Sequence, residues 1–207
     1  MLLRRLKTVK MRNESLYREV FIANTIHLVA EGGFEAATTR AISAGRTEHN
    51  NIKLNEAHIY RTFGTKENLF AETFALLDNE LVGLINNAVA DFSLNADFRE
   101  QCEGLFRKLW RFLLQNEEKC RYYTRYYYSA YFKKNSTKQH VEKFRPLVQT
   151  MRPVFVENAD VWSLFHHAIT VLLAFAVSCY NGTIEDNEDS ETHIFNVVYM
   201  SISTYLR

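Results

Sequence analysis

A short segment near residue 55 carries the side chains whose types and spacing are best suited to chemistry. Asn55, Glu56 and His58 come where a short helix over residues 56–63 is predicted to begin, and each can form hydrogen bonds. Tyr60 and Lys66 add a hydroxyl and an ammonium group close behind. Polar groups at the start of a short helix suit the edges of nucleic-acid bases, and a lysine at a helix N-terminus suits a phosphate.

Helices are predicted to position this segment. Asn13 can cap a first helix that runs to about Glu31 and ends at Gly32 and Gly33, because glycine accepts the left-handed conformation of a C-cap. Thr38 or Thr39 can cap a short second helix, and Asn55 the third. Glycine 64 breaks the third helix, and Thr65 begins a long fourth one that keeps helical apolar spacing to about residue 92.

The rest of the chain is predicted to be helical as well. Only 7 glycines and 2 prolines occur in 207 residues, which favours long helices with short connections. The expected spans are 96–117, 119–134, 137–157, 160–181 and 189–206, with Pro146 and Pro153 interrupting or kinking the third of these. The fold class is therefore all-α, with about nine helices.

The spaced motifs of residues 18–70 resemble the tetracycline-repressor (TetR) family of bacterial regulators. The resemblance is carried by EGGFEAATTRAI at 31–42 and LNEAHIYRTFGTKENLF at 54–70, which repeat several of the family's elements in the right order. It covers about a quarter of the chain. It implies a helix-turn-helix DNA-binding domain over residues 1–66, followed by a helical ligand-binding and dimerisation domain over residues 67–207.

The sequence departs from the family's pattern at three places. Ile42 and Tyr60 are 18 positions apart, several more than usual, and the surplus falls between Gly45 and Lys53 in the turn that sets the angle between the second and third helices. Those residues either lengthen the second helix or bulge outward, and they either add a DNA contact through Arg46, His49, Asn50 or Lys53 or spoil docking. Thr62 stands where the family usually has Tyr or His, and Asn24 where it usually has Ala.

The resemblance and the residue chemistry together define candidate DNA contacts. Threonine hydroxyls at a helix start can reach phosphates as well as cap the helix, and Tyr60 and Lys66 match the family's phosphate contacts. The candidates are Thr38, Thr39, Arg40, Asn55, Glu56, His58, Tyr60, Arg61 and Lys66. The implied partners are a double-stranded DNA operator and an unknown small-molecule effector, and the implied assembly is a homodimer through the last two long helices.

The charge distribution agrees with a DNA-binding N-terminal part. The whole chain has a formal net charge of +1, but residues 1–70 carry +4 and residues 71–207 carry −3. Five of the bases lie in residues 1–12 without an acid, which we interpret as a flexible basic arm.

The tyrosine-rich run at residues 121–132 is the best clue to a ligand pocket. Tyrosine offers a flat apolar ring and a hydroxyl, which suits an aromatic or cationic ligand. The candidate ligand-binding residues are Trp110, Tyr123, Tyr127, Tyr131 and His166. An equally compatible interpretation is that the rings form core and exposed surface. His166 and His167 are adjacent and point in different directions, so a shared metal is not expected.

Other classes of protein are disfavoured. The 3 cysteines form no C-x-x-C pair, and the sequence has no Ser-His-Asp order, metal-ligand spacing, paired carboxylates or glycine-rich phosphate loop, so neither an enzyme, a metal site nor a cofactor is expected. No signal peptide is expected, because Arg4 and Arg5 follow Leu3 without an apolar stretch, and no apolar run, the longest being near 169–179, is expected to span a membrane. A cytoplasmic regulator is therefore predicted. The alternative is a helical small-molecule-binding protein whose degenerate helix-turn-helix no longer reads DNA.

Overall fold

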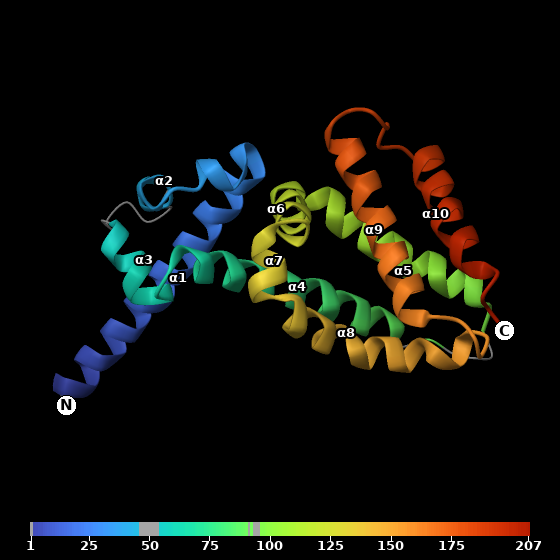
Figure 1. Cartoon of the computed structure of the whole chain (residues 1–207), viewed down its shortest axis with the longest axis horizontal. Helices are drawn as coiled ribbons and strands as arrows, with labels where there is room; N and C mark the ends of the chain where they lie inside the picture. The colour runs from blue at the N-terminus through green and yellow to red at the C-terminus, as the bar shows by residue number, and fades with distance from the viewer. Residues whose placement is uncertain (1, 46–53, 91, 93–95) are drawn as a thin grey trace. The chain divides into compact units, whose positions relative to one another are not determined.

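The computed structural model describes the backbone of residues 2–45, 54–90, 92 and 96–207, and side chains from residue 14 onward. Every regular element in these residues is a helix, and the extended backbone is limited to an isolated bridge between Phe155 and Leu206 (Figure 1). The prediction of an all-α fold is confirmed. The candidate contacts Arg46, His49, Asn50 and Lys53 lie outside the described residues.

Three helices precede the long fourth one: α1 (Leu2–Ala36), α2 (Thr39–Ala44) and α3 (Glu56–Phe63). The predicted helix start at Asn13, and with it the flexible arm, is wrong, because α1 begins at Leu2. The physical reason is the absence of glycine and proline before residue 32, together with many good helix formers such as Leu, Arg and Lys. Gly33 has a φ of 76° and a non-helical conformation, so α1 is kinked there.

The remaining helices are α4 (Lys66–Val89), α5 (Phe98–Gln115), α6 (Glu117–Tyr127), α7 (Ala130–Asn135), α8 (Thr137–Met151), the 3₁₀-helix η1 (Arg152–Val154), α9 (Val161–Tyr180) and α10 (Glu188–Ser203). The single helix predicted over 119–134 is two helices, because Ser129 caps α7 by accepting a hydrogen bond from the Phe132 N–H (3.4 Å). The helix predicted over 137–157 ends at Met151, and Pro146 lies inside it without ending it.

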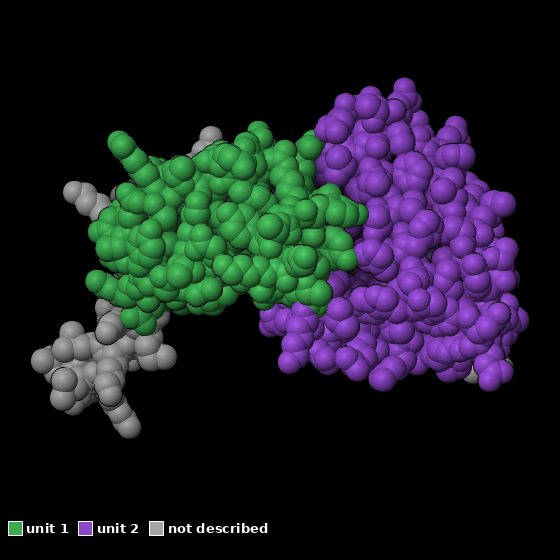
Figure 2. Space-filling view, viewed as in Figure 1, with its two compact units in different colours: residues 1–77, 121–137 green, residues 78–120, 138–207 purple. Residues whose placement is uncertain are grey.

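The chain forms two compact units (Figure 2). Unit 1 contains Met1–Leu77 and Arg121–Thr137, and unit 2 contains Asp78–Cys120 and Lys138–Arg207. The division passes through α4 and α6 and falls after the first residue of α8. The tyrosine-rich run at residues 121–132 therefore belongs to the same unit as the first three helices. The predicted domain boundary after residue 66 is a statement about function and stays a prediction.

The core of unit 2 is built from α5, α9 and α10, which contact one another. Leu109 and Trp110 of α5, Leu172 of α9 and Ile194 and Phe195 of α10 are all buried. Apolar side chains recur along each helix at helical spacing, and burying them removes water from a continuous apolar face.

Helix α9 is long and apolar enough to span a membrane by length and composition alone, with 20 residues and a mean hydropathy of 1.7. The sequence predicts the longest apolar run near 169–179, and the apolar helix is longer because it extends from Val161. Helices of soluble folds meet the same criterion, and α9 packs against α5 and α10 within unit 2.

Candidate nucleic-acid interface and ligand cavity

Thr38, one of the two threonines that the sequence offers as a cap, is the N-cap of α2. The Thr38 hydroxyl accepts a hydrogen bond from the Ala41 N–H (3.1 Å), which satisfies one of the N–H groups left open at a helix start. Ile42 is fully buried and anchors α2 in the core of unit 1. The Thr38 hydroxyl therefore already has a hydrogen-bond partner within the protein.

Helix α3 begins with a reciprocal cap. The Asn55 side-chain oxygen accepts from the His58 N–H (3.1 Å), and the Asn55 N–H donates to His58 Nδ1 (3.4 Å). The His58 ring also stacks on Tyr17 of α1, with 4.9 Å between the ring centroids. Both side chains therefore hold the start of α3 in place, in addition to being candidates for contact with bases.

A hydrogen bond between side chains joins α2 to α3. The Thr39 hydroxyl donates to the Glu56 carboxylate. Because Glu56 is the first residue of α3, this contact helps to set how the two helices meet. Thus five of the nine predicted DNA contacts, Thr38, Thr39, Asn55, Glu56 and His58, take part in hydrogen bonds within the three-helix arrangement.

The other four predicted DNA contacts present their polar groups differently. Ile59 and Phe63 bury one face of α3, while Tyr60 is 52% exposed and Arg61 is exposed. Arg40 of α2 is exposed as well. Lys66, at the start of α4, is half-buried, and its ammonium lies 5.5 Å from the centroid of the Phe70 ring. These four side chains carry the three cationic groups and the phenol among the predicted DNA contacts.

Sequence reasoning missed the structural role of Asn24. Its side-chain N–H₂ donates to the Ile42 carbonyl (3.0 Å), which ties α1 to the C-terminal turn of α2. A Cβ atom at Gly45 would lie 2.5 Å from this amide, so glycine is needed where the turn leaves α2. The signal was present in the sequence as the departure at position 24, where the buried polar side chain requires a partner. Thr62, the other departure, is half-buried in α3.

The predicted ligand-binding tyrosines form an aromatic core in unit 1. Tyr123 stacks on Phe74 (4.8 Å between centroids), Tyr127 lies 4.5 Å from Phe132, and Tyr131 lies 5.0 Å from Phe34. We call this the aromatic cluster, and it also includes Phe70, Tyr122 and Tyr126. Among these rings the structure supports the alternative interpretation, core with exposed surface, since Tyr128 is 67% exposed.

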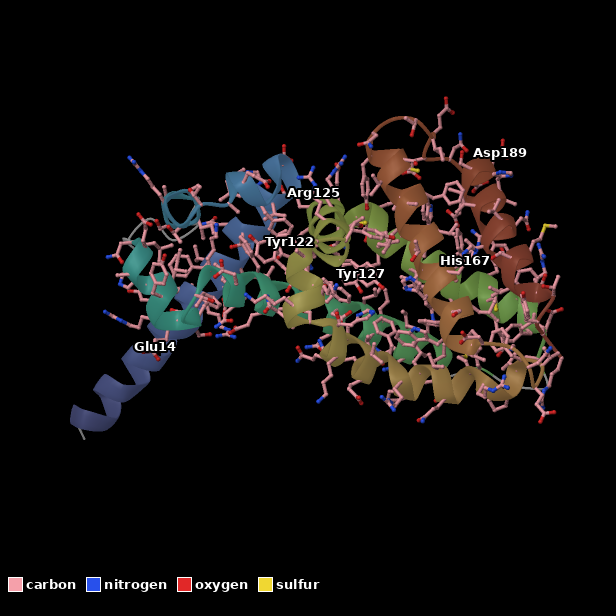
Figure 3. All side chains as sticks on the ribbon, viewed as in Figure 1. Glu14, Tyr122, Arg125, Tyr127, His167 and Asp189 are labelled. Carbon is pink, nitrogen blue, oxygen red and sulfur yellow. The ribbon has the colours of Figure 1, made fainter. Side chains whose placement is uncertain are left out.

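Hydrogen bonds hold the aromatic cluster and the helix that carries it in place. The Tyr122 hydroxyl donates to the Phe70 carbonyl (2.8 Å), and the Tyr126 hydroxyl lies 2.9 Å from the Ser136 hydroxyl. Burial raises the pKa of Tyr122 well above its ordinary value. Arg125 donates to the Val29 carbonyl, near the end of the first segment of α1 (Figure 3). The Tyr122 and Tyr126 hydroxyls therefore have hydrogen-bond partners within the protein.

The two other predicted ligand-binding residues lie in unit 2. Trp110 is buried and stacks on Phe106 with 5.9 Å between centroids. His166 is exposed on α9, and its pKa is lowered by partial burial and by the charges of His140 and His167. None of the five predicted ligand-binding residues lines the cavity described next.

Unit 2 contains a cavity of about 100 Å³ that is lined almost wholly by apolar side chains. Its walls come from α4, α5, α9 and α10 and from Met151 and Phe155, and they include Ile85, Cys102, Leu164, Phe165, Ala168, Phe195 and Tyr199. We call it the apolar cavity. A second hollow of about 420 Å³ is more polar, with Gln101, Thr150 and Arg207 in its wall. Within the described residues, no group of three or more His, Cys, Asp or Glu could hold a metal ion.

Solved structures are similar to this chain over nearly its whole length. A TetR family transcription regulator from Marinobacter aquaeolei VT8 is 18% identical, with a TM-score of 0.74, and the match covers 92% of this chain and 97% of that one. A structure from Shewanella sp. PV-4, assigned to the same family, is 14% identical, with a TM-score of 0.71 and coverage of 92% and 98%. A TetR-like transcriptional regulator from Rhodococcus sp. RHA1 is 14% identical, with a TM-score of 0.62 and coverage of 90% and 96%.

No protein-family model matches the sequence, and no curated protein matches it. At 14–18% identity the structural likeness shows the fold: the chain has the fold of the TetR family transcription regulators. The expectation of that fold, based on a quarter of the chain, is confirmed over 92% of it. Helix α9 belongs to this helical fold, in which it packs against α5 and α10.

Proposed function

We propose that this chain is a DNA-binding transcriptional regulator, a repressor that a small-molecule ligand releases from its operator. The observation that carries the proposal is the presentation of α3, which is anchored by Ile59 and Phe63 while Tyr60 and Arg61 remain exposed. A helix held in this way can enter the major groove with its polar face outward. The same three-helix arrangement belongs to a fold that occurs in transcription regulators.

The charges around α3 support binding to the phosphate backbone. Arg40, Arg61 and Lys66 are among the cations that give residues 1–70 a net charge of +4. Each phosphate that a protein neutralises releases counterions, so affinity falls steeply as the salt concentration rises. Tyr60 can donate a hydrogen bond to a phosphate oxygen, which positions α3 without reading the sequence.

One observation favours the alternative, a ligand-binding protein that no longer reads DNA. Asn55, Glu56 and His58 are the polar residues at the start of α3, and all three form hydrogen bonds within the protein. Fewer groups are then available for the edges of bases. The alternative therefore predicts weak binding without sequence preference, whereas the proposed regulator must discriminate between duplexes.

The test is binding of the full-length protein to the DNA upstream of its own gene, beside an unrelated duplex, at 50 and 200 mM salt. We expect selective binding that weakens by at least about 10³-fold between the two concentrations, as for a protein with six or more phosphate contacts. Tyr60→Ala with Lys66→Ala should weaken binding to both duplexes and lower the salt slope, because both remove phosphate contacts.

The matched control is Tyr128→Ala with Lys138→Ala, which removes an exposed tyrosine and an exposed lysine outside the three N-terminal helices. It should leave affinity and salt slope unchanged. Equal binding of both duplexes, or equal effects of the two double variants, would favour the degenerate alternative.

We propose that the functional state is a homodimer through α9 and α10. Only 17% of the apolar window of α9 is buried within the chain, and Val197 and Met200 of α10 are 38% and 68% exposed. Apolar helices left open in this way suit a four-helix interface across a two-fold axis. Val197→Glu with Met200→Glu should give monomers in light scattering, whereas Thr192→Glu, at an exposed polar position of α10, should leave dimers.

Dimerisation would link ligand binding to DNA release. Two DNA-binding parts read half-sites that lie about 34–36 Å apart or a multiple of it, so a small change in their spacing removes one from its groove. Helix α4 begins with Lys66, next to the candidate interface, and ends at Val89, with Ile85 in the wall of the apolar cavity. A ligand that binds one position of α4 more tightly would shift the protein toward that state.

The proposed setting is the cytoplasm, and the proposed activity is binding rather than catalysis. The TetR fold is typically not enzymatic. Turnover of a bound compound by the purified protein would contradict this part of the proposal.

A further inference from the structure

The residues that line the apolar cavity disfavour a charged ligand. Among the residues that the structure describes, its lining contains no Asp, Glu, Lys, Arg or His side chain, and the polar groups of Cys102 and Tyr199 are a thiol and a phenol. Burial raises the pKa of Cys102 to about 12 and is also the main cause of the raised pKa of Tyr199. Both groups are neutral at physiological pH, so the walls offer hydrogen bonds but no counter-ion.

A cation adjoins the cavity, but it already has partners. The Arg99 guanidinium lies over the rings of Tyr199 and Phe195, with 4.9 and 5.2 Å to their centroids. It also donates a hydrogen bond to the Asn196 side-chain oxygen (2.6 Å). Arg99 is exposed and is not part of the lining. An anion in the cavity would therefore lose its hydration without gaining this guanidinium.

The size of the cavity limits the occupant. In other proteins an apolar cavity of about 150 Å³ stays dry and binds benzene, so a volume of about 100 Å³ suits a ring of that size or something smaller, with slight movement of the walls. An ionised group buried without a partner costs far more than a neutral polar group, whereas apolar atoms gain by leaving water. Both arguments point to the same class of molecule.

We infer that the apolar cavity binds an uncharged, mainly apolar small molecule, about the size of one six-membered ring with at most one small polar group. This inference rests on the proposed function, because it names the chemical class of the effector. A hydroxyl or carbonyl on such a molecule would find the Tyr199 phenol, and its ring would contact Phe165 and Phe195. Contact with Ile85 would make α4 sensitive to occupancy.

The test compares three probes that share a ring and differ in charge: benzyl alcohol, benzoate and benzylamine at pH 7.5. Binding to the full-length protein is followed by methyl NMR, in which the cavity residues Ile85, Leu105 and Ile202 report occupancy. We expect benzyl alcohol to bind with a dissociation constant at least about 10-fold lower than either charged probe.

Two variants locate the binding site on α9. Ala168→Leu adds three carbons at a lining position, and Ala130→Leu makes the same change at an exposed position of α7, outside the lining and outside the proposed dimer helices. Ala168→Leu should weaken benzyl alcohol at least about 10-fold because the added volume displaces the ring, and Ala130→Leu should not. If Ala168→Leu fails to fold, Cys102→Leu fills the cavity from α5 instead.

The inference is overturned if benzoate or benzylamine binds as tightly as benzyl alcohol. It is also overturned if no probe binds, or if Ala168→Leu binds benzyl alcohol as well as Ala130→Leu does. DNA binding by the ligand-free protein is measured separately. Selective DNA binding with preference for a charged probe refutes the ligand class alone, and benzyl alcohol in the cavity without DNA selectivity refutes the regulator alone.

Discussion

The aromatic cluster of unit 1 and the apolar cavity of unit 2 are both built from large apolar side chains, yet they are packed differently. In the cluster, Tyr122 and Tyr126 have no exposed surface, and their hydroxyls meet the Phe70 carbonyl and the Ser136 hydroxyl. In the cavity, side chains from five helices and from Phe155 leave about 100 Å³ unfilled. A high density of tyrosines therefore marks packed core here, and space is found where aliphatic and phenylalanine side chains dominate.

The difference follows from the hydrogen-bonding needs of the two residue sets. A buried tyrosine hydroxyl without a partner is costly, so tyrosines in a core are drawn to carbonyls and hydroxyls that fix their position. Aliphatic side chains carry no such requirement, and a void among them costs only lost contacts and transfer energy. A binding cavity is thus less costly to keep open in unit 2 than in the aromatic cluster.

Removal of a ring from the aromatic cluster should have the largest effect on stability. Tyr122→Ala should lower the free energy of unfolding by about 3–5 kcal/mol, because it leaves a large cavity in tight packing. Tyr128→Ala, at the residue that directly follows α6 and is 67% exposed, should change it by less than about 0.5 kcal/mol. Urea unfolding of both variants checks this. Similar effects of the two variants would contradict the assignment of the tyrosines to a packed core.

A buried ionic contact in unit 2 should come next. Asp78 is 1% exposed and contacts His140 Nδ1 (2.9 Å) and Lys143 Nζ (3.4 Å) of α8. Asp78→Ala should lower the free energy of unfolding by about 3 kcal/mol, because it leaves buried partners without their carboxylate. Glu142→Ala removes a carboxylate from an exposed pair with Arg145 and should have little effect. If denaturation curves show that Asp78→Ala and Glu142→Ala lower the free energy of unfolding equally, the Asp78 contact is not a buried, stabilising one.

The dependence of the free energy of unfolding on alkaline pH should report on the Cys102 thiol in the cavity wall. Cys102 has a pKa of about 12 in the folded protein against 9.0 ordinarily. Because the folded-state pKa is raised, this thiol stabilises the fold below pH 9 and loses that contribution as the pH rises toward 12. The free energy of unfolding of the native protein should fall more steeply than that of Cys102→Ala, by up to about 1.4 kcal/mol per pH unit.

The comparison is made by denaturant unfolding of both proteins at pH 8, 9 and 10. Other titrating groups, including Tyr122, are present in both and cancel in the difference. Parallel pH profiles would mean that the Cys102 thiol is hydrated, which would contradict a dry cavity.

The smallest expected effects contrast two glycines. Gly45→Ala should destabilise by about 1–3 kcal/mol, because the new Cβ would lie 2.5 Å from the buried Asn24 amide. Gly104→Ala, in the interior of α5 with no atom within 4 Å of the new Cβ, should stabilise by about 0.5–1 kcal/mol. Thermal unfolding gives both signs, and a stabilising Gly45→Ala would show that Asn24 can give way without loss.

Local sequence signals determined much of this protein. The cap at Asn55, the helix end at Gly64 and the apolar spacing of α9 and α10 depend on neighbours in the chain, and residue types predict each of them. For α2 they narrow the cap to Thr38 or Thr39, and Thr38 is the one used. The same signals, read in order, identified the fold. Local signals failed at residues 2–13, where the absence of helix breakers outweighed a possible cap at Asn13.

Only the tertiary structure decided which aromatic residues are core and where space remains. Tyr123, Tyr127 and Tyr131 share a helical spacing that fits a pocket as well as a core, and their partners Phe34, Phe70 and Phe74 are distant in sequence. The apolar cavity likewise joins Ile85, Cys102, Ala168 and Tyr199 from four helices. Helix periodicity states which face is buried, but whether the buried faces fill the space between them depends on how the helices pack.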